Sequence, residues 1–316
     1  MNLSRRNFMA LSGGLVATSM LPVLAKGNDL FRKRGRFERM SLAMRQVKCG
    51  AEKPFSILHI SDTHLAAAYP HEGEAKMAVS ARRTKTFGGS QEEALCDSLE
   101  WAKKNTDYVL HTGDLIDFQS EANFDLLKKY YGDIIFGPMG NHEFFTYMPD
   151  EKIVAGEPFK DKSRALLKKN FPNDISIFSK VVNGVNFVSV DDVFGTVTPE
   201  QVELFNAEVK KNLPIVLCMH VPFFSQSLWN KSARFWRRSN QKYTDASDIA
   251  PGSDFKRQLE DKTTSEFIAS LRKEKALKAI LCGHLHLTME DDFSPYAKQY
   301  VVGGNFMCHG QEVLFS

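Results

Sequence analysis

The chain has 316 residues, of which 43% are hydrophobic and 25% charged, and its formal net charge is +3. This is the composition of an ordinary globular protein, long enough to bury a substantial core without disulfide bonds. So small a net charge does not by itself imply binding to nucleic acid or to a membrane, and we expect no nucleic-acid partner. Nothing in the sequence specifies an oligomeric state.

Residues 1–25 have the organisation of an export signal. Arg5 and Arg6 precede an apolar run, and small residues at its end suit cleavage after Ala25. The paired arginines followed by Phe8 resemble a twin-arginine signal. A short membrane anchor or a buried first helix is the alternative, but two glycines and a proline interrupt the run, which is short for a membrane span. We therefore expect an exported, periplasmic protein without a stable membrane anchor.

The five cysteines cannot all pair with one another. Cys218 and Cys282 lie within apolar strand sequence, which favours small buried residues over metal ligation or disulfide chemistry. For Cys49, Cys96 and Cys308, the sequence leaves open whether they pair. The cysteine count therefore neither supports nor excludes an oxidising compartment.

Residues 26–316 are predicted to form a single domain with a basic lead-in over 26–39. In chain order, hydrophobic periodicity predicts strands at 40–45 and 55–60, a helix at 91–104, a strand at 108–110, a helix at 124–131, strands at 134–136, 175–182 and 185–190, a helix at 199–211, a strand at 215–217, a helix at 265–273, and strands at 279–281, 300–302 and 313–315. Asn183-Gly184 predicts a hairpin between two of these strands. The alternation of strands and helices predicts an α/β protein with one mixed sheet and a second, more antiparallel sheet, with helices outside.

Two long segments, 66–90 and 223–262, lack a clear pattern and are predicted to be loops. Each begins directly after a candidate site residue, His64 or His220. Since loops of this length are usually functional or disordered, we expect substrate-shaping loops. Four residues of the second segment could stack on a base and hold a phosphate, meet a lipid headgroup, or only anchor the loop: Trp229, Trp236, Arg237 and Arg238.

Five short polar motifs follow the predicted strands. They are Asp62-Thr63-His64, Gly113-Asp114, Gly140-Asn141-His142-Glu143, His220, and Gly283-His284-Leu285-His286. Each is weak alone, because a histidine after a strand is more often a hydrogen-bonded core residue than a ligand. Together they supply a mixed carboxylate and imidazole set that suits manganese, iron or zinc, unlike a thiolate-rich structural zinc site.

Geometry gives these motifs more specific roles. Asp62 and His64 would point to the same side of an extended stretch. Asp114 could bridge two ions through its two carboxylate oxygens. Glycines in the motifs fit tight turns where the chain passes close to the ions.

The ordered series resembles the signature of the calcineurin-like metallophosphoesterase family, from about Ile57 to His286. The resemblance implies a four-layer α/β/β/α sandwich of two mixed sheets with a dinuclear metal site at strand ends. It assigns Asp62, His64 and His286 to one metal, Asn141, His220 and His284 to the other, Asp114 to the bridge, and His142 to catalysis beside the leaving group.

Two departures from the family pattern narrow the class. Phe118 stands where protein Ser/Thr phosphatases have an arginine, and Asp117 stands where purple acid phosphatases have a tyrosine ligand. Both branches are therefore disfavoured, leaving bacterial phosphoesterases that include cyclic-nucleotide and lipid-headgroup phosphodiesterases. His59 and His111 lie outside the pattern and are expected to support the site or the core.

The function that this implies is metal-dependent hydrolysis of a small-molecule phosphate ester, such as a nucleotide or lipid headgroup, with phosphodiesters favoured. Two divalent ions (manganese, iron or zinc) would hold a bridging hydroxide that attacks phosphorus in line. His142 would act as general acid. The alternatives are a phosphomonoesterase, another metal hydrolase such as an amidohydrolase, and a non-catalytic metal-stabilised binding protein. Amidohydrolases place their His-x-His pair early in the chain, whereas here it comes late.

Overall fold

The computed structural model describes residues 40–152, 157–239 and 261–316. The predicted export signal and basic lead-in lie outside these ranges, as does most of the second half of the segment 223–262. No helix in the described ranges is long and apolar enough to cross a membrane. All five cysteines are described and carry free thiols.

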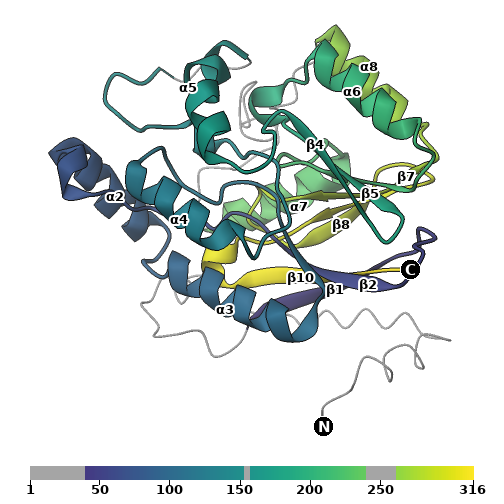
Figure 1. Cartoon of the computed structure of the whole chain (residues 1–316), viewed down its shortest axis with the longest axis horizontal. Helices are drawn as coiled ribbons and strands as arrows, with labels where there is room; N and C mark the ends of the chain where they lie inside the picture. The colour runs from purple at the N-terminus through teal and green to yellow at the C-terminus, as the bar shows by residue number, and fades with distance from the viewer. Residues whose placement is uncertain (1–39, 153–156, 240–260) are drawn as a thin grey trace.

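Two mixed sheets face each other in the centre of the molecule (Figure 1). The first has the order β1-β10-β2-β3, with β1 (Ser41–Val47) parallel to β10 (His309–Phe315), β10 antiparallel to β2 (Phe55–Ile60), and β2 parallel to β3 (Tyr108–His111). The second has the order β4-β5-β6-β7-β9-β8 and comprises β4 (Ile177–Val182), β5 (Val185–Val190), β6 (Ile215–Cys218), β7 (Leu277–Cys282), β8 (Met289–Asp292) and β9 (Lys298–Val301).

The predicted hairpin is confirmed, because β4 and β5 pair antiparallel around Asn183 and Gly184, both at positive φ. The second sheet is the more antiparallel of the two, as predicted, but by a small margin, because two of its five strand pairs are antiparallel and one of the three pairs of the first sheet is. The strands β5, β6, β7 and β9 run parallel to one another, and only the two edge pairs are antiparallel. Helices between β5, β6 and β7 return the chain to the same end of the sheet, and such crossovers produce parallel neighbours.

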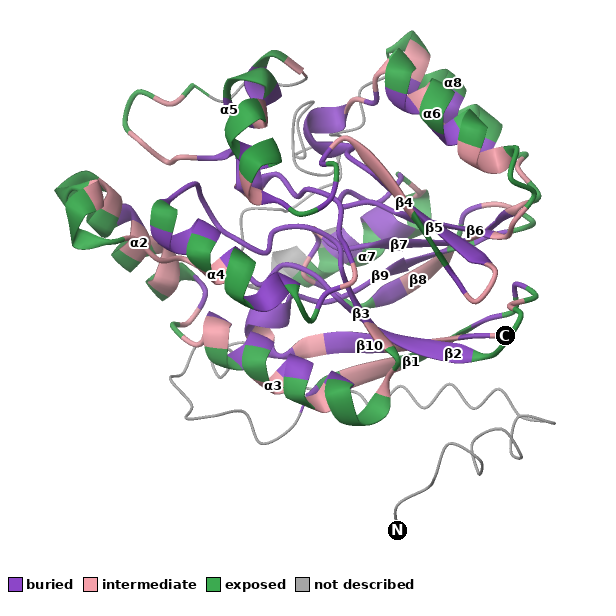
Figure 2. Ribbon diagram, in the orientation of Figure 1, coloured by how far each residue is buried: buried purple, intermediate pink, exposed green. Residues whose placement is uncertain are grey.

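Helices cover the outer face of each sheet (Figure 2). Those beside the first sheet are α3 (Gln91–Asn105) and α4 (Glu121–Tyr131), and those beside the second are α6 (Pro199–Val209) and α8 (Lys262–Leu271). Helix α4 begins three residues earlier than predicted because the side chain of Ser120 accepts a hydrogen bond from the backbone N–H of Asn123. Helix α6 begins at a capping box formed by Thr198 and Gln201.

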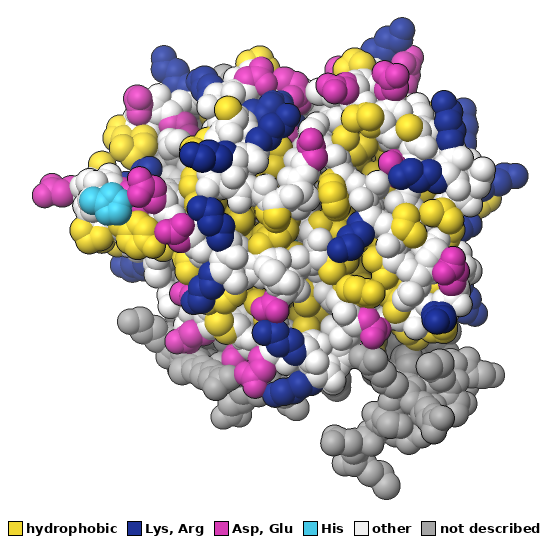
Figure 3. All heavy atoms as spheres, viewed as in Figure 1, with side chains coloured by type: hydrophobic (Ala, Val, Ile, Leu, Met, Phe, Trp, Pro, Cys, Tyr) yellow, Lys and Arg dark blue, Asp and Glu magenta, His cyan; other side chains and the backbone are white. Residues whose placement is uncertain are grey.

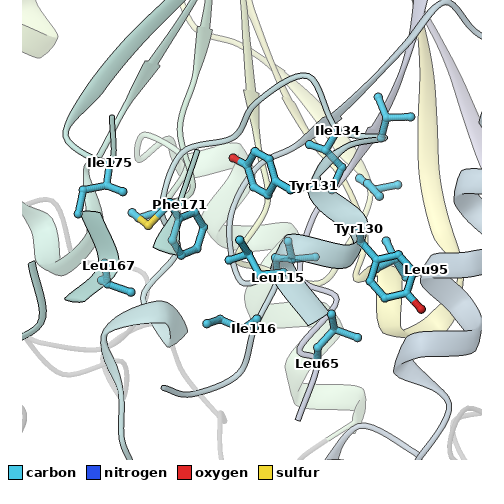
Figure 4. Packing of buried hydrophobic residues seen from close by; sticks show 14 of the residues in the cluster. Leu65, Leu95, Leu115, Ile116, Tyr130, Tyr131, Ile134, Leu167, Phe171 and Ile175 are labelled. Carbon is cyan, nitrogen blue, oxygen red and sulfur yellow. The ribbon is translucent and has the colours of Figure 1, made fainter. Parts of the chain in front are cut away.

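The helices and sheets form four layers, and three clusters of buried apolar side chains fill the spaces between them. Alternate residues of each central strand point to opposite sides, so that in β6 Ile215 and Leu217 pack toward α6 and α8 while Val216 and Cys218 pack toward the first sheet. The layer between α3, α4 and the first sheet continues to Leu167 and the chain that follows it (Figure 4). The predicted α/β/β/α sandwich is thereby confirmed.

Several predicted elements differ from the structure. The segment 66–90 contains the helix α2 (Glu74–Thr86), and the segment 223–262 contains α7 (Gln226–Ser239), so neither is irregular throughout. Residues 134–136 form no strand, because of their backbone N–H groups only that of Ile135 bonds to β3, at the carbonyl of Val109. The helix α5 (Glu157–Asn170) was not predicted; most of its residues are polar, and few are buried.

Candidate metal centre

The polar motifs converge at the carboxyl ends of strands from both sheets. Asp62 and His64 follow β2, Asp114 follows β3, His220 follows β6, and the His-x-His pair follows β7. Parallel strands bring their carboxyl ends to one edge of a sheet, which is where open α/β folds place their ligands. Two facing sheets therefore bring donors from both edges into one site.

One group of donors consists of Asp62, His64 and His286. His286 Nε2 lies 3.2 Å from Asp62 Oδ1 and 3.1 Å from His64 Nε2. Two ligands bound side by side to one cation at about 2.1 Å would lie about 3.0–3.4 Å apart. These atoms are therefore spaced as ligands of one ion would be.

A second group consists of Asp114, His220 and His284. His220 Nε2 lies 3.2 Å from Asp114 Oδ2 and 3.2 Å from His284 Nδ1. The burial of His220 opposes its charged form, but the carboxylates of Asp114 and Asp62 outweigh burial and raise its pKa to about 10. Strong stabilisation of positive charge at this position is what a cation site requires.

Asp114 lies between the two groups. Its Oδ2 is 3.2 Å from His220 Nε2 and 3.8 Å from His64 Nε2. Its Oδ1 is turned away and accepts the backbone N–H of His142 at 2.8 Å. The expectation that both carboxylate oxygens face the ions is therefore wrong, and a single oxygen faces both groups.

Two buried oxygens test whether the site fits metal ions. Asn141 Oδ1 is buried and accepts no hydrogen bond from the described residues, and Asp62 Oδ1 is buried with no hydrogen bond of good geometry, although His286 Nε2 lies 3.2 Å from it. Leaving a buried acceptor without a donor is costly, and for a carboxylate oxygen the cost is larger. Both oxygens come from the predicted ligand set, so the donor set fits hard or borderline divalent cations.

The backbone around the donors is unusual. Five donor residues adopt left-handed conformations: Asp62 (φ 56°), His64 (φ 55°), Asp114 (φ 55°), His284 (φ 67°) and His286 (φ 53°). Asp62 and His64 thus share a site through left-handed backbone conformations, and the expected extended stretch is wrong. Non-glycine residues at positive φ are uncommon and cost free energy, and they cluster at functional sites.

Glycines allow the turns to pass close to one another, as predicted. A Cβ at Gly140 would lie 2.2 Å from Asp114 Oδ1, and one at Gly283 would lie 2.5 Å from Asp62 Oδ2. Either side chain would displace a candidate ligand.

Hydrogen bonds fix two of the imidazole rings. His64 Nδ1 donates to Asp117 Oδ1 at 2.9 Å, and His220 Nδ1 donates to the carbonyl of Thr112 at 2.7 Å. When either ring is neutral, this leaves the Nε2 lone pair facing the centre, which is the tautomer a metal ligand needs. Burial also lowers the pKa of His64 to about 4, favouring its neutral form.

His142 lies beside the donors and is partly exposed. Its Nε2 is 3.9 Å from Asp114 Oδ2, and its Nδ1 is 2.9 Å from Asp117 Oδ1 and 2.8 Å from Tyr147 Oη. Burial disfavours its protonated form, but Asp114 and Asp117 raise its pKa above the ordinary value. The ring is therefore oriented from one side while its other nitrogen faces the site.

Glu143 has a role that the sequence did not reveal, although it ends a quoted motif. Its Oε2 accepts the backbone N–H groups of Asp114 (3.0 Å) and Gly140 (2.8 Å). Its Oε1 accepts those of Leu115 (2.7 Å) and Ile116 (3.2 Å), whose side chains are buried in the apolar layer. One carboxylate thus holds the Asp114 turn against the Asn141 turn.

Other residues contact the candidate ligands without belonging to the five motifs. Phe87, which follows α2, stacks on the ring of His64 with centroids 3.9 Å apart and planes 7° apart. Asp192 Oδ1 accepts the backbone N–H of His220 at 3.2 Å. His59 and His111 are buried, contact Thr112 and Thr63, and have pKa values that burial lowers to about 3, as expected of supporting residues.

The residues expected to meet a substrate base are placed only in part. Trp229 is buried on α7, with its ring centroid 6.2 Å from that of Phe224. It therefore fits the alternative of a segment anchor. The other three, Trp236, Arg237 and Arg238, lie on α7, but their side chains are outside the described part of the chain.

Replacing Glu143 by glutamine tests its structural role. An amide keeps only one acceptor oxygen, so two backbone N–H groups would face an NH₂ group. We expect Glu143→Gln to lower the free energy of unfolding of the metal-free protein by about 2–5 kcal/mol. The exposed Glu100→Gln is the control and should cost less than about 1 kcal/mol. Chemical denaturation measures both, and equal effects would contradict this role.

Comparison with known proteins assigns the chain to a family. A family model described as calcineurin-like phosphoesterase matches residues 55–287. No protein with a curated description matches the chain.

Solved structures give weaker similarity. A dimetal phosphatase from Danio rerio shows 13% identity and a TM-score of 0.48, with 80% of this chain and 88% of that chain covered. A putative 5'-nucleotidase from Staphylococcus aureus shows 14% identity and a TM-score of 0.42, with 80% and 49% covered. This chain therefore spans about half of that nucleotidase. Because these TM-scores are low, the assignment rests on the family model: the chain belongs to the calcineurin-like phosphoesterase family.

Proposed function

We propose that the protein hydrolyses phosphodiesters with two divalent metal ions held by the two donor groups. The observation that carries this proposal is the position of Asp114 Oδ2, which lies within 4 Å of His220 Nε2 and of His64 Nε2. Asp62, His64 and His286 would hold one ion. Asn141, His220 and His284 would hold the other. Asp114 would be shared. When bound, the ions supply positive charge to phosphoryl oxygens and make water more acidic for attack on phosphorus.

His142 is the residue suited to move a proton. Its Nδ1 is held by Asp117 and Tyr147, which leaves Nε2 directed to the side of Asp114. In this proposal, protonated Nε2 donates to the departing oxygen of the ester. Help of this kind is typically worth about 100- to 10,000-fold in rate.

The charge of the site favours a diester over a monoester. Among the described residues, Arg83 is the one lysine or arginine with hydrogen bonds or ion pairs at the site, and its Nε and Nη2 both donate to Asp117. The described part of the site therefore offers no further lysine or arginine for the second negative charge of a monoester. The identity of the group beyond the phosphate would depend on the residues that line the entrance.

A substrate panel tests the reaction class. With Mn²⁺ added, we expect turnover of bis(p-nitrophenyl) phosphate to exceed that of p-nitrophenyl phosphate by at least about tenfold in kcat/KM, because the diester carries one negative charge fewer. The reverse order would make the protein a phosphomonoesterase. Inactivity on both and on a broad set of phosphate esters, with two metals bound, would favour a metal-stabilised binding protein.

Asp114→Asn tests the shared ligand. The change removes the negative charge nearest both donor groups, so we expect weaker binding of both ions and a loss of more than about 1,000-fold in kcat. Metal content by elemental analysis and turnover of the diester are the measurements. The exposed Asp125→Asn on α4 is the matched control. Near-normal turnover of Asp114→Asn would remove the residue from its proposed role.

His142→Ala separates proton transfer from metal binding. We expect metal content to stay at two ions per chain while kcat falls by about 100-fold or more on a diester with an alkoxide leaving group. The loss should be smaller for a p-nitrophenyl leaving group, which departs without protonation. Loss of an ion, or equal losses on both substrates, would argue against a general acid. The exposed His71→Ala serves as control.

A further inference from the structure

The helix α2 is poorly integrated into the core. It projects from the body of the protein (Figure 1), and most of its surface is exposed (Figure 2). Val79 is its one buried residue. Its other attachments include hydrogen bonds from the hydroxyls of Ser80 and Thr84 to the carbonyl of Ala66. Apolar burial therefore does not explain how this helix is placed.

Arg83 connects α2 to the metal centre. Its Nε donates to Asp117 Oδ2 at 2.5 Å, and its Nη2 donates to Asp117 Oδ1 at 3.0 Å. The carboxylate is fully buried, and the arginine side chain is 17% exposed. By contrast, Arg82 and Lys85 on the same helix are exposed. The pairing is a two-pronged charged contact with a fixed plane, which orients the carboxylate as well as neutralising it.

The carboxylate of Asp117 in turn orients two histidines. His64 Nδ1 and His142 Nδ1 each lie 2.9 Å from Asp117 Oδ1. A single oxygen thus receives two imidazoles together with Nη2 of Arg83. If the guanidinium were absent, the carboxylate of Asp117 would be held less firmly against rotation about its Cβ–Cγ bond. Both imidazoles would then lose an acceptor of fixed position.

The rings that flank Arg83 touch the same two histidines. The guanidinium carbon lies 4.5 Å from the ring centroid of Tyr147 and 5.1 Å from that of Phe87. Tyr147 Oη is 2.8 Å from His142 Nδ1, and Phe87 stacks on His64. Arg83 therefore contacts three groups, and each of them contacts one or both histidines.

We propose that Arg83 is a positioning residue of the centre, through which α2 sets the orientation of both the candidate ligand His64 and the proton donor His142. The inference rests on the proposed two-ion site. It assigns Arg83 no contact with substrate. A buried ion pair is weak evidence for stability, and specifying a geometry is the better-supported use of one. The half of the centre built on His220 and His284 should be little affected.

The test compares Arg83→Gln with Arg82→Gln in the full-length protein. After removal of metal with a chelator, Mn²⁺ is titrated and both binding events are followed by calorimetry. We expect Arg83→Gln to weaken one event by about 10- to 100-fold and to leave the other within about threefold. Asp62→Asn should weaken the same event. Arg82→Gln should change neither.

Kinetics and rescue distinguish positioning from a general structural effect. With saturating Mn²⁺, kcat of Arg83→Gln for the diester should fall by about 10- to 100-fold while KM stays within about threefold. Arg83→Lys keeps the positive charge but loses the planar, two-pronged contact with Asp117, so its kcat should lie between those of the normal protein and Arg83→Gln. Added guanidinium ion should restore part of the Mn²⁺ affinity of Arg83→Ala and leave Arg82→Ala unchanged.

Three results would overturn the proposal. The first is unchanged Mn²⁺ affinity in Arg83→Gln. The second is equal weakening of both events together with a lower unfolding midpoint of the metal-free protein, which would indicate general damage. The third is a rise in KM alone, which would make Arg83 a substrate contact. If the normal protein binds two Mn²⁺ ions but hydrolyses no phosphate ester, the proposed function fails while the titration still decides the role of Arg83.

Discussion

The site depends on one electrostatic constraint, which is that two buried carboxylates lie among imidazoles and form no ion pair with a lysine or arginine of the described residues. Asp62 and Asp114 are both buried, and their negative charges help to raise the pKa of His220 to about 10. A buried carboxylate oxygen without a donor is costly unless a cation completes the arrangement. Bound metal ions would remove this cost, so metal binding and stability of the site should be coupled.

The surrounding fold holds the unfavourable backbone conformations of the donor residues in place. Five donor residues adopt left-handed backbone conformations, which the surrounding structure must hold in place. Glu143 ties the Asp114 turn to the Asn141 turn through four backbone N–H groups, and the adjacent Leu115 and Ile116 are fixed in the apolar layer. Rigid turns backed by packed strands are a better support for ligands than mobile loops. The outer surface shows no comparable organisation on the face in Figure 3, where basic and acidic side chains are interspersed.

Agreement between sequence and structure follows the strength of local signals. Strands with clear periodicity, such as β2 and β5, and the hairpin at Asn183-Gly184 are where the sequence placed them. The helices α2 and α5 were not found, because each buries few of its side chains and so has little apolar periodicity. Residues 134–136 are apolar but make one bond to β3, since a strand requires a partner that the sequence does not specify.

The sequence by itself determined the family and the list of candidate ligands, because their residue types and order survive as a linear pattern. The tertiary structure decided how those residues are used. It turned a single oxygen of Asp114 toward both donor groups, replaced the expected extended stretch at Asp62 and His64 by left-handed backbone conformations, and brought Arg83 from a distant helix to Asp117. These features depend on contacts between segments far apart in the chain, and a local pattern of residues carries no information about such contacts.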